Sequence, residues 1–218
     1  MTTPASPALS RADVDQAVSA ERRRLADYVA DLTDDQWATP SLCDAWTVRE
    51  TIAHLTLTTR ITVPRLVRAA IRARGSFDRM EIDLAAERAA AYSTTELVAQ
   101  LHESAGSTRR TPGSSPMDPL MDLVIHAQDI ARPLGHRYVS PPGVVAACLA
   151  YVATNKFMGG PRRLSGVRLL STDTGWSLGD GAELCGSDID LLMVAAGRRA
   201  GLTTLDGPGA AIVAERVG

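Results

Sequence analysis

Four helix-start signals in the first 133 residues constrain the fold of this chain more than any other feature. Each signal is an N-cap residue followed by an apolar stripe of helical spacing. The four N-cap residues are Ser10, Thr47, Ser93 and Asp118. Glu50 and Glu96 complete capping boxes with the second and third, and Pro119 follows the fourth at the first helical position. Four amphipathic helices with one long connection between the second and the third predict a four-helix bundle.

The ends of two of these helices can also be predicted. The second is expected to run from Thr47 to Gly75 with a kink at Pro64, because proline lacks the amide proton that an inner turn requires. The fourth is expected to end at Arg132, directly before Pro133. The alanine-rich, charged stretch after Gly75 has no assigned element and belongs to the long connection.

The segment RYVSPPG, residues 137–143, marks a change in the character of the chain. The elements expected beyond it are a helix over 144–155, a hairpin of two strands over 166–173 and 175–181, a helix over 189–201 closed by Gly201, and a last short helix over 207–217. We therefore expect an α-helical N-terminal four-helix bundle domain over residues 1–137 and a small C-terminal α+β domain over residues 138–218.

Composition excludes several classes of protein. The net charge of −2 and the pI of about 6.1 give no basic surface for nucleic acid. The first residues lack the basic and apolar regions of a signal peptide, and the longest uncharged run is too weakly apolar to span a bilayer. We therefore expect a cytoplasmic protein without nucleic-acid or membrane partners, and a homodimer is one option for its assembly.

Two carboxylates and an imidazole share one stripe of the predicted fourth helix, because Asp122, His126 and Asp129 fall at positions i, i+4 and i+7. Burying such groups is costly unless they are paired or bind a metal. On the second helix, His54 lies one turn beyond Glu50. His54, His126 and one carboxylate would supply the three protein ligands of an open zinc-type site, with the ring nitrogens about 3 Å apart. The same spacing also fits an ordinary pair of Asp and His on a helix face.

The three cysteines are far apart and include no C-x-x-C pair, which argues against a disulfide framework or a thiolate zinc site. Cys43 lies in a loop just before a predicted helix N-terminus, where the helix dipole lowers the pKa of a thiol. No histidine is adjacent to it in the sequence, so a packed thiol is favoured over a nucleophile.

Two blocks of the sequence resemble a known enzyme family. They are LTDDQWATPSLCDAWTVRETIAHL, residues 32–55, and VIHAQDIARPLG, residues 124–135. Both resemble the signature blocks of the mycothiol-dependent maleylpyruvate isomerase family, a branch of the DinB-like metalloenzymes. The segment LLMVAAGRRAGLTTLDGPG, residues 191–209, is similar to the end of the family's C-terminal domain.

The resemblance implies a DinB-like bundle that holds a divalent metal, usually zinc. The implied ligands are His54, Asp122 and His126. The family usually has glutamate where this chain has Asp122, so direct ligation by the shorter side chain is weakened, lost or replaced by a bridging water. The resemblance also implies that Asp129 holds His126 or neighbouring backbone. An arginine of the C-terminal domain binds the substrate carboxylate in the family, and the candidates here are Arg198 and Arg199.

The chemistry implied is that of a metal-activated thiolate, with mycothiol as the small-molecule cosubstrate. Such a thiolate could add to a cis double bond, allow rotation about the resulting single bond and leave again, which is an isomerisation. On a substrate with a leaving group or an epoxide, it would be an S-transfer. Two alternatives stay open: a non-catalytic bundle whose metal site has decayed, and a metal-dependent hydrolase that uses bound water.

Overall fold

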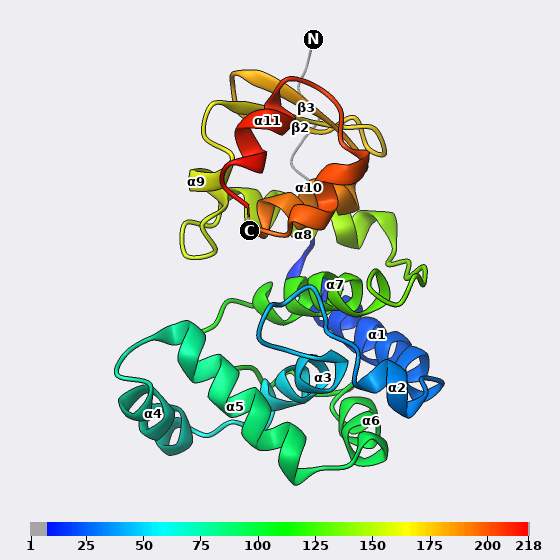
Figure 1. Cartoon of the computed structure of the whole chain (residues 1–218), viewed down its shortest axis with the longest axis vertical. Helices are drawn as coiled ribbons and strands as arrows, with labels where there is room; N and C mark the ends of the chain where they lie inside the picture. The colour runs from blue at the N-terminus through cyan, green and yellow to red at the C-terminus, as the bar shows by residue number, and fades with distance from the viewer. Residues whose placement is uncertain (1–7, 218) are drawn as a thin grey trace. The chain divides into compact units, whose positions relative to one another are not determined.

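The computed structural model describes residues 8–217, which form two compact units. The bundle unit is Arg11–Tyr138, and the C-terminal unit consists of residues 139–217 together with residues 8–10. The bundle unit is mostly helical, and the C-terminal unit combines helices with a sheet of three strands (Figure 1). The predicted fold class, a DinB-like helical bundle followed by a small α+β part, is confirmed. Among the described residues, no helix is both long and apolar enough to cross a membrane.

Helices that begin at or next to the four predicted starts form the core of the bundle unit. Its elements are α1 (Arg11–Ala30), α2 (Asp34–Trp37), α3 (Val48–Leu57), α4 (Val63–Arg72), α5 (Phe77–Ala91), α6 (Thr94–Glu103) and α7 (Asp118–Ala131). Helix α1 packs against α6 and α7, and α3 packs against α5, α6 and α7. Figure 1 shows α3 surrounded by these three neighbours. Helix α3 is therefore the central element of the unit.

The prediction of a single kinked second helix is wrong, and the long connection contains a helix that was not predicted. The chain does not kink at Pro64. Instead α3 ends at Leu57, and Pro64 lies in the first turn of a separate helix, α4. Proline is tolerated there, because the first amides of a helix have no partner in any case. The connection is not irregular either, since it contains α5, which Ser76 caps by accepting the Arg79 N–H at 3.3 Å.

Both predicted capping boxes are confirmed. The N–H of Thr47 donates to Glu50 Oε2 at 2.9 Å, and the N–H of Ser93 donates to Glu96 Oε2 at 2.7 Å. Asp118 differs slightly from the prediction, because it is the first residue of α7 and not its N-cap.

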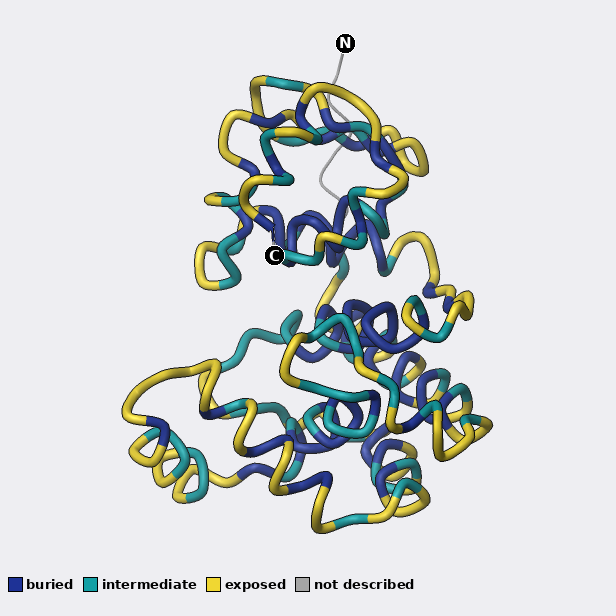
Figure 2. Tube along the Cα trace, in the orientation of Figure 1, coloured by how far each residue is buried: buried dark blue, intermediate teal, exposed yellow. Residues whose placement is uncertain are grey.

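Helix α7 is the most deeply buried element of the bundle unit. Every residue from Pro119 to Ala131 is buried except Asp122, as the dark tube of α7 in Figure 2 shows. A helix that is buried nearly all round has no polar face to account for its ionisable residues. Asp122, His126 and Asp129 therefore require partners inside the bundle.

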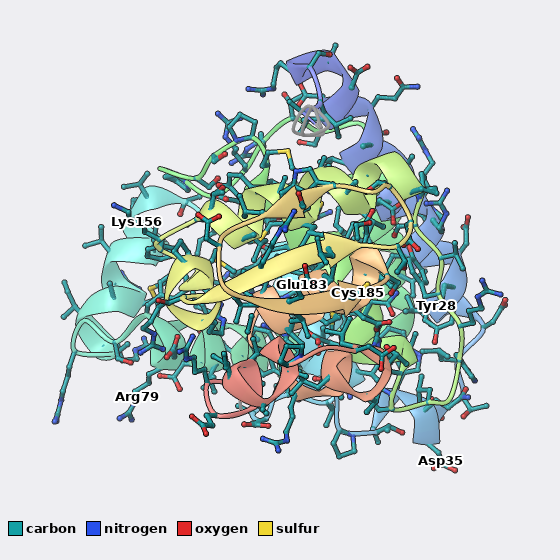
Figure 3. All side chains as sticks on the ribbon, turned by 90° about the horizontal axis from the view of Figure 1, so that it is seen from above. Tyr28, Asp35, Arg79, Lys156, Glu183 and Cys185 are labelled. Atoms are coloured by element: carbon teal, nitrogen blue, oxygen red, sulfur yellow. The ribbon has the colours of Figure 1, made fainter. Side chains whose placement is uncertain are left out.

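The C-terminal unit has one more strand than predicted. Its elements are α8 (Pro142–Thr154), α9 (Gly160–Arg163), β1 (Val167–Ser171), β2 (Ser177–Leu178), β3 (Ala182–Gly186), α10 (Asp188–Ala195), a 3-10 helix (Arg199–Thr204) and α11 (Gly209–Ala214). The predicted hairpin of β1 and β2 is confirmed, with Leu169 opposite Leu178. Strand β3 pairs with β1 in parallel, and Figure 3 looks onto this sheet with Glu183 and Cys185 of β3 labelled.

The helix expected to close at Gly201 ends six residues earlier, at Ala195. Gly197, with φ of 95°, makes the turn that ends it, and the 3-10 helix follows. A backbone of this kind favours glycine, because a side chain at positive φ would be strained.

Candidate metal centre

Three of the predicted site residues meet inside the bundle unit. His54 comes from α3, and Asp122 and His126 come from α7, one turn apart. Their side chains are 13%, 25% and 8% exposed, so the cluster is largely screened from solvent but not sealed. One ligand atom from each residue can be chosen so that all three lie within 4.8 Å of one another.

The three side chains are close enough to be candidate ligands of one small divalent ion. His54 Nε2 and Asp122 Oδ2 are 4.0 Å apart, and the rings of His54 and His126 have centroids 5.2 Å apart at an angle of 74°. Nitrogen and oxygen ligands lie roughly 2.0–2.2 Å from zinc, so two ligand atoms of a tetrahedral site are about 3.4 Å apart. The His54–Asp122 distance of 4.0 Å exceeds this by about half an ångström, so a small movement of the side chains would complete the pair. The donor set of two imidazoles and a carboxylate is also one that zinc prefers.

Each histidine contacts a carboxylate through its Nδ1 atom. His54 Nδ1 lies 3.0 Å from Glu81 Oε2, and His126 Nδ1 lies 2.9 Å from Asp129 Oδ2. The Asp129 side chain is fully buried. A carboxylate on one ring nitrogen fixes the tautomer and the ring orientation of a histidine ligand and makes its other nitrogen more basic. Both histidines are therefore arranged to offer Nε2 to an ion.

Glu81 was not found by the sequence reasoning. It lies on α5, the helix that was missed, and α5 packs directly on α3. The signal in the sequence was weak, because the buried face of α5 includes two alanines and an arginine beside only two large apolar residues. The buried residues of α5 are Met80, Leu84, Ala85, Arg88 and Ala89.

The loop before α3 covers one side of the cluster. The indole of Trp46 lies 4.8 Å from the ring of His54 and 5.7 Å from that of His126, measured between centroids. Two backbone hydrogen bonds hold the loop in place: the Ser41 N–H donates to Trp46 O at 2.9 Å, and the Leu42 N–H donates to Asp129 O at 3.0 Å. The loop is thus tied both to itself and to α7.

Cys43, from the same loop, has a histidine beside it in space although none is adjacent in the sequence. Its Sγ donates to Asp129 Oδ2 at 3.2 Å and lies 3.8 Å from His126 Nδ1. Cys43, His126 and Asp129 are close enough to form a second possible ligand group. The contacts among them are those of a hydrogen-bonded cluster, in which Asp129 accepts from both neighbours.

Burial raises the pKa of Asp122 above its ordinary value, while the two histidines act in the opposite direction. Asp118 and Glu81 add to the rise, because both are acidic. A quarter of the Asp122 side chain remains exposed, which limits the size of this effect. The direction still matters, since a site that disfavours a bare carboxylate gains from a bound cation.

The candidate arginines belong to the C-terminal unit, where both contact backbone. Arg198 Nη1 donates to Ala196 O at 2.9 Å, and Arg199 Nη1 donates to Ala214 O at 3.1 Å. The role of either residue toward a substrate carboxylate stays a prediction.

Comparison with known proteins identifies the family. A family described as the mycothiol maleylpyruvate isomerase N-terminal domain matches residues 18–131, which is more than half of the chain. No curated protein matches significantly.

Two solved structures share the fold. The crystal structure of a mycothiol-dependent maleylpyruvate isomerase is 17% identical with a TM-score of 0.60, and that of a histidine-to-alanine mutant is 15% identical with a TM-score of 0.63. In each case 96% of this chain and 97% of the other are covered. At this identity the structures establish the fold alone, whereas the domain match establishes the relationship. The chain belongs to the mycothiol maleylpyruvate isomerase family.

Proposed function

We propose that this protein is a divalent-metal-dependent enzyme that uses a low-molecular-weight thiol, mycothiol, as its cosubstrate. The reaction is the isomerisation of a small electrophilic, carboxylate-bearing substrate, or S-transfer to it. One observation carries the proposal: His54, Asp122 and His126 converge, and each histidine is backed by a carboxylate. Membership of the family supports the thiol-dependent isomerase class.

The residues of the bundle unit have distinct roles in this proposal. His54, Asp122 and His126 would hold zinc or a similar ion and leave a coordination position open. When bound, such an ion lowers the pKa of a thiol so that it reacts as thiolate at neutral pH. Glu81 and Asp129 keep the proton on Nδ1 of each histidine and fix the ring planes. Trp46 packs over both imidazoles and excludes water from that side.

The proposal divides the chain into two functional domains. Residues 1–137 carry the metal and thiol site. Residues 138–218 supply Arg198 or Arg199 for the substrate carboxylate, because a guanidinium recognises a carboxylate through paired hydrogen bonds. Substitution of each arginine by alanine should raise KM for a carboxylate substrate without changing metal content.

Cobalt substitution tests the thiol step directly. The full chain is stripped with a chelator and loaded with Co²⁺, and mycothiol is then added while the near-ultraviolet spectrum is recorded. We expect one Co²⁺ per chain and a new thiolate-to-cobalt charge-transfer band. The experiment is run on the Cys43→Ser protein, because Cys43 Sγ lies only 3.8 Å from His126 Nδ1 and could itself ligate cobalt.

The outcomes separate the parts of the proposal. The first outcome is that the Cys43→Ser protein binds no more cobalt than its His54→Ala derivative. That result would favour a bundle without a metal site. The second outcome is that one cobalt binds but its spectrum does not change when the thiol is added. That result would contradict the proposed thiol-dependent reaction and indicate a metal site with another function.

A further inference from the structure

The C-terminal unit contains a buried carboxylate without a hydrogen-bond partner. Asp188 is the first residue of α10, its exposed fraction is 1%, and neither of its side-chain oxygens has a hydrogen-bond partner. Burying a carboxylate in this way is costly, because the lost hydration is not replaced. Native proteins pair nearly all such groups, so an unpaired one indicates a bound proton, water or ion.

The N-terminus of α10 provides no backbone hydrogen bond to the Asp188 side chain. Ser187 is the N-cap of α10, and its hydroxyl accepts the N–H of Asp190 at 3.3 Å. The free amide of Asp188 itself donates to a different carboxylate, Asp173 Oδ2, at 2.9 Å. The Asp188 side chain is therefore left without the amide donors that stabilise acidic residues at other helix starts.

Oxygen atoms of the turn after β1 gather around this carboxylate. The hydroxyls of Ser171 and Thr174 are near enough to lower the pKa of Asp188, although neither forms a hydrogen bond of normal geometry with it. Burial, the largest effect, raises that pKa, and Asp173 raises it further. The groups that act on Asp188 include no cationic side chain among the described residues.

The turn is internally ordered, so its oxygens have fixed positions. Ser171 Oγ accepts the N–H groups of Asp173 and Thr174 at 3.2 and 3.0 Å. It also accepts the hydroxyl of Thr174 at 2.9 Å. This turn lies next to the start of α10, because Asp173 accepts the Asp188 N–H and the hydroxyls of the turn act on the Asp188 carboxylate.

We propose that Asp173 and Asp188, with the hydroxyl of Thr174, bind a hard divalent cation of the calcium type. Such ions take oxygen ligands, including carboxylates, hydroxyls and carbonyls, whereas zinc prefers the nitrogen and sulfur donors that this site lacks. The cation would neutralise two acidic groups that have no basic partner in the site. It would also fasten the turn after β1 to the start of α10. This inference does not depend on the proposed enzymatic function, because it concerns other residues.

Thermal unfolding of the full chain tests the proposal. The protein is stripped with a chelator, and Tm is measured while CaCl₂ is added, with MgCl₂ in a parallel series. Wild type should gain several degrees at saturating calcium, because a ligand that binds only the folded state stabilises it. Asp188→Asn and Asp173→Asn should each weaken the apparent calcium affinity at least tenfold. The matched control, Asp180→Asn, removes an exposed carboxylate of the same unit and should respond to calcium like wild type.

Asp188→Asn should fold, because it keeps the side-chain volume and removes a charge that is costly to bury. The proposal is overturned if neither cation raises Tm of wild type more than that of Asp188→Asn. A carboxyl that is satisfied by water or by its own proton would give that result.

Discussion

At the scale of single residues, the candidate metal centre depends most on Asp122. It is the only residue between Pro119 and Ala131 that is not buried, so its side chain reaches the one open side of α7. The resemblance implies a glutamate here, which is longer by one methylene. The 4.0 Å between Asp122 Oδ2 and His54 Nε2 is longer than the roughly 3.4 Å between two ligands of a tetrahedral zinc ion.

We expect Asp122→Glu to keep or increase zinc affinity, because the longer side chain shortens this span. Asp122→Ala should reduce zinc affinity at least 10–100-fold, since loss of even an outer partner of a ligand commonly costs that much. Zinc titration against a competing chelator measures both. Asp118→Asn is the matched control, because Asp118 lies one turn away on the same helix and outside the ligand group. Equal affinities in all four proteins would show that Asp122 is no ligand.

Asp188 gives a prediction about pH. Its pKa is raised in the folded protein, chiefly by burial and further by Asp173. A carboxyl with a raised folded pKa destabilises the protein above its unfolded pKa of about 3.9, and this cost disappears at lower pH. In chelator, Asp188→Asn should therefore have a higher Tm than wild type at pH 7, and the difference should vanish toward pH 4. A lower Tm for the variant at pH 7 would contradict this account of the residue.

At the scale of elements, local signals predicted the helix starts, and contacts between distant segments escaped prediction. The capping boxes at Thr47 and Ser93 need only four consecutive residues, so the sequence shows them directly. Strand β3 pairs in parallel with β1, and no local pattern reports a pairing of that kind. Helix α5 was missed because alanines give little contrast between its two faces.

The same distinction explains what was found of the site. Helix periodicity places Asp122 and His126 on one stripe of α7, and the resemblance adds His54 from another helix. Glu81 requires knowing that α5 packs on α3, and the contact of Cys43 with Asp129 requires the loop to reach α7. These contacts join segments that are distant in the chain, and a single sequence does not show which distant segments pack together.

Helix α5 should matter to the site through Glu81. We expect Glu81→Gln to lower zinc affinity about 10-fold, because the amide orients His54 less well than the carboxylate 3.0 Å from its Nδ1. Glu87→Gln is the control on the same helix, since Glu87 is exposed and pairs only with surface arginines. The d–d spectrum of the cobalt-loaded protein should change in Glu81→Gln and not in Glu87→Gln. If the two variants bind zinc equally well, Glu81 does not position His54.

At the scale of the whole molecule, the metal-site residues all belong to one compact unit. His54, Glu81, Asp122, His126 and Asp129 lie between Arg11 and Tyr138. The unit closes on its own last residues, because Tyr138 O accepts from Gln128 Nε2 at 3.0 Å and the Tyr138 hydroxyl donates to the buried Glu21 at 3.3 Å. A boundary placed before Tyr138 would break both contacts, whereas Val139 is exposed.

We therefore expect a fragment of residues 1–140 to fold and to bind one zinc ion with the affinity of the full chain. A matching fragment that ends at residue 136 should be less stable, because Glu21 and Gln128 each lose a hydrogen bond to Tyr138. Circular dichroism and zinc titration of both fragments, with Asp122→Ala in the longer one as a control for non-specific zinc, measure these effects. A longer fragment that is folded but binds no zinc would mean that the C-terminal unit supplies part of the metal site, and the three-ligand assignment within the bundle would then be wrong.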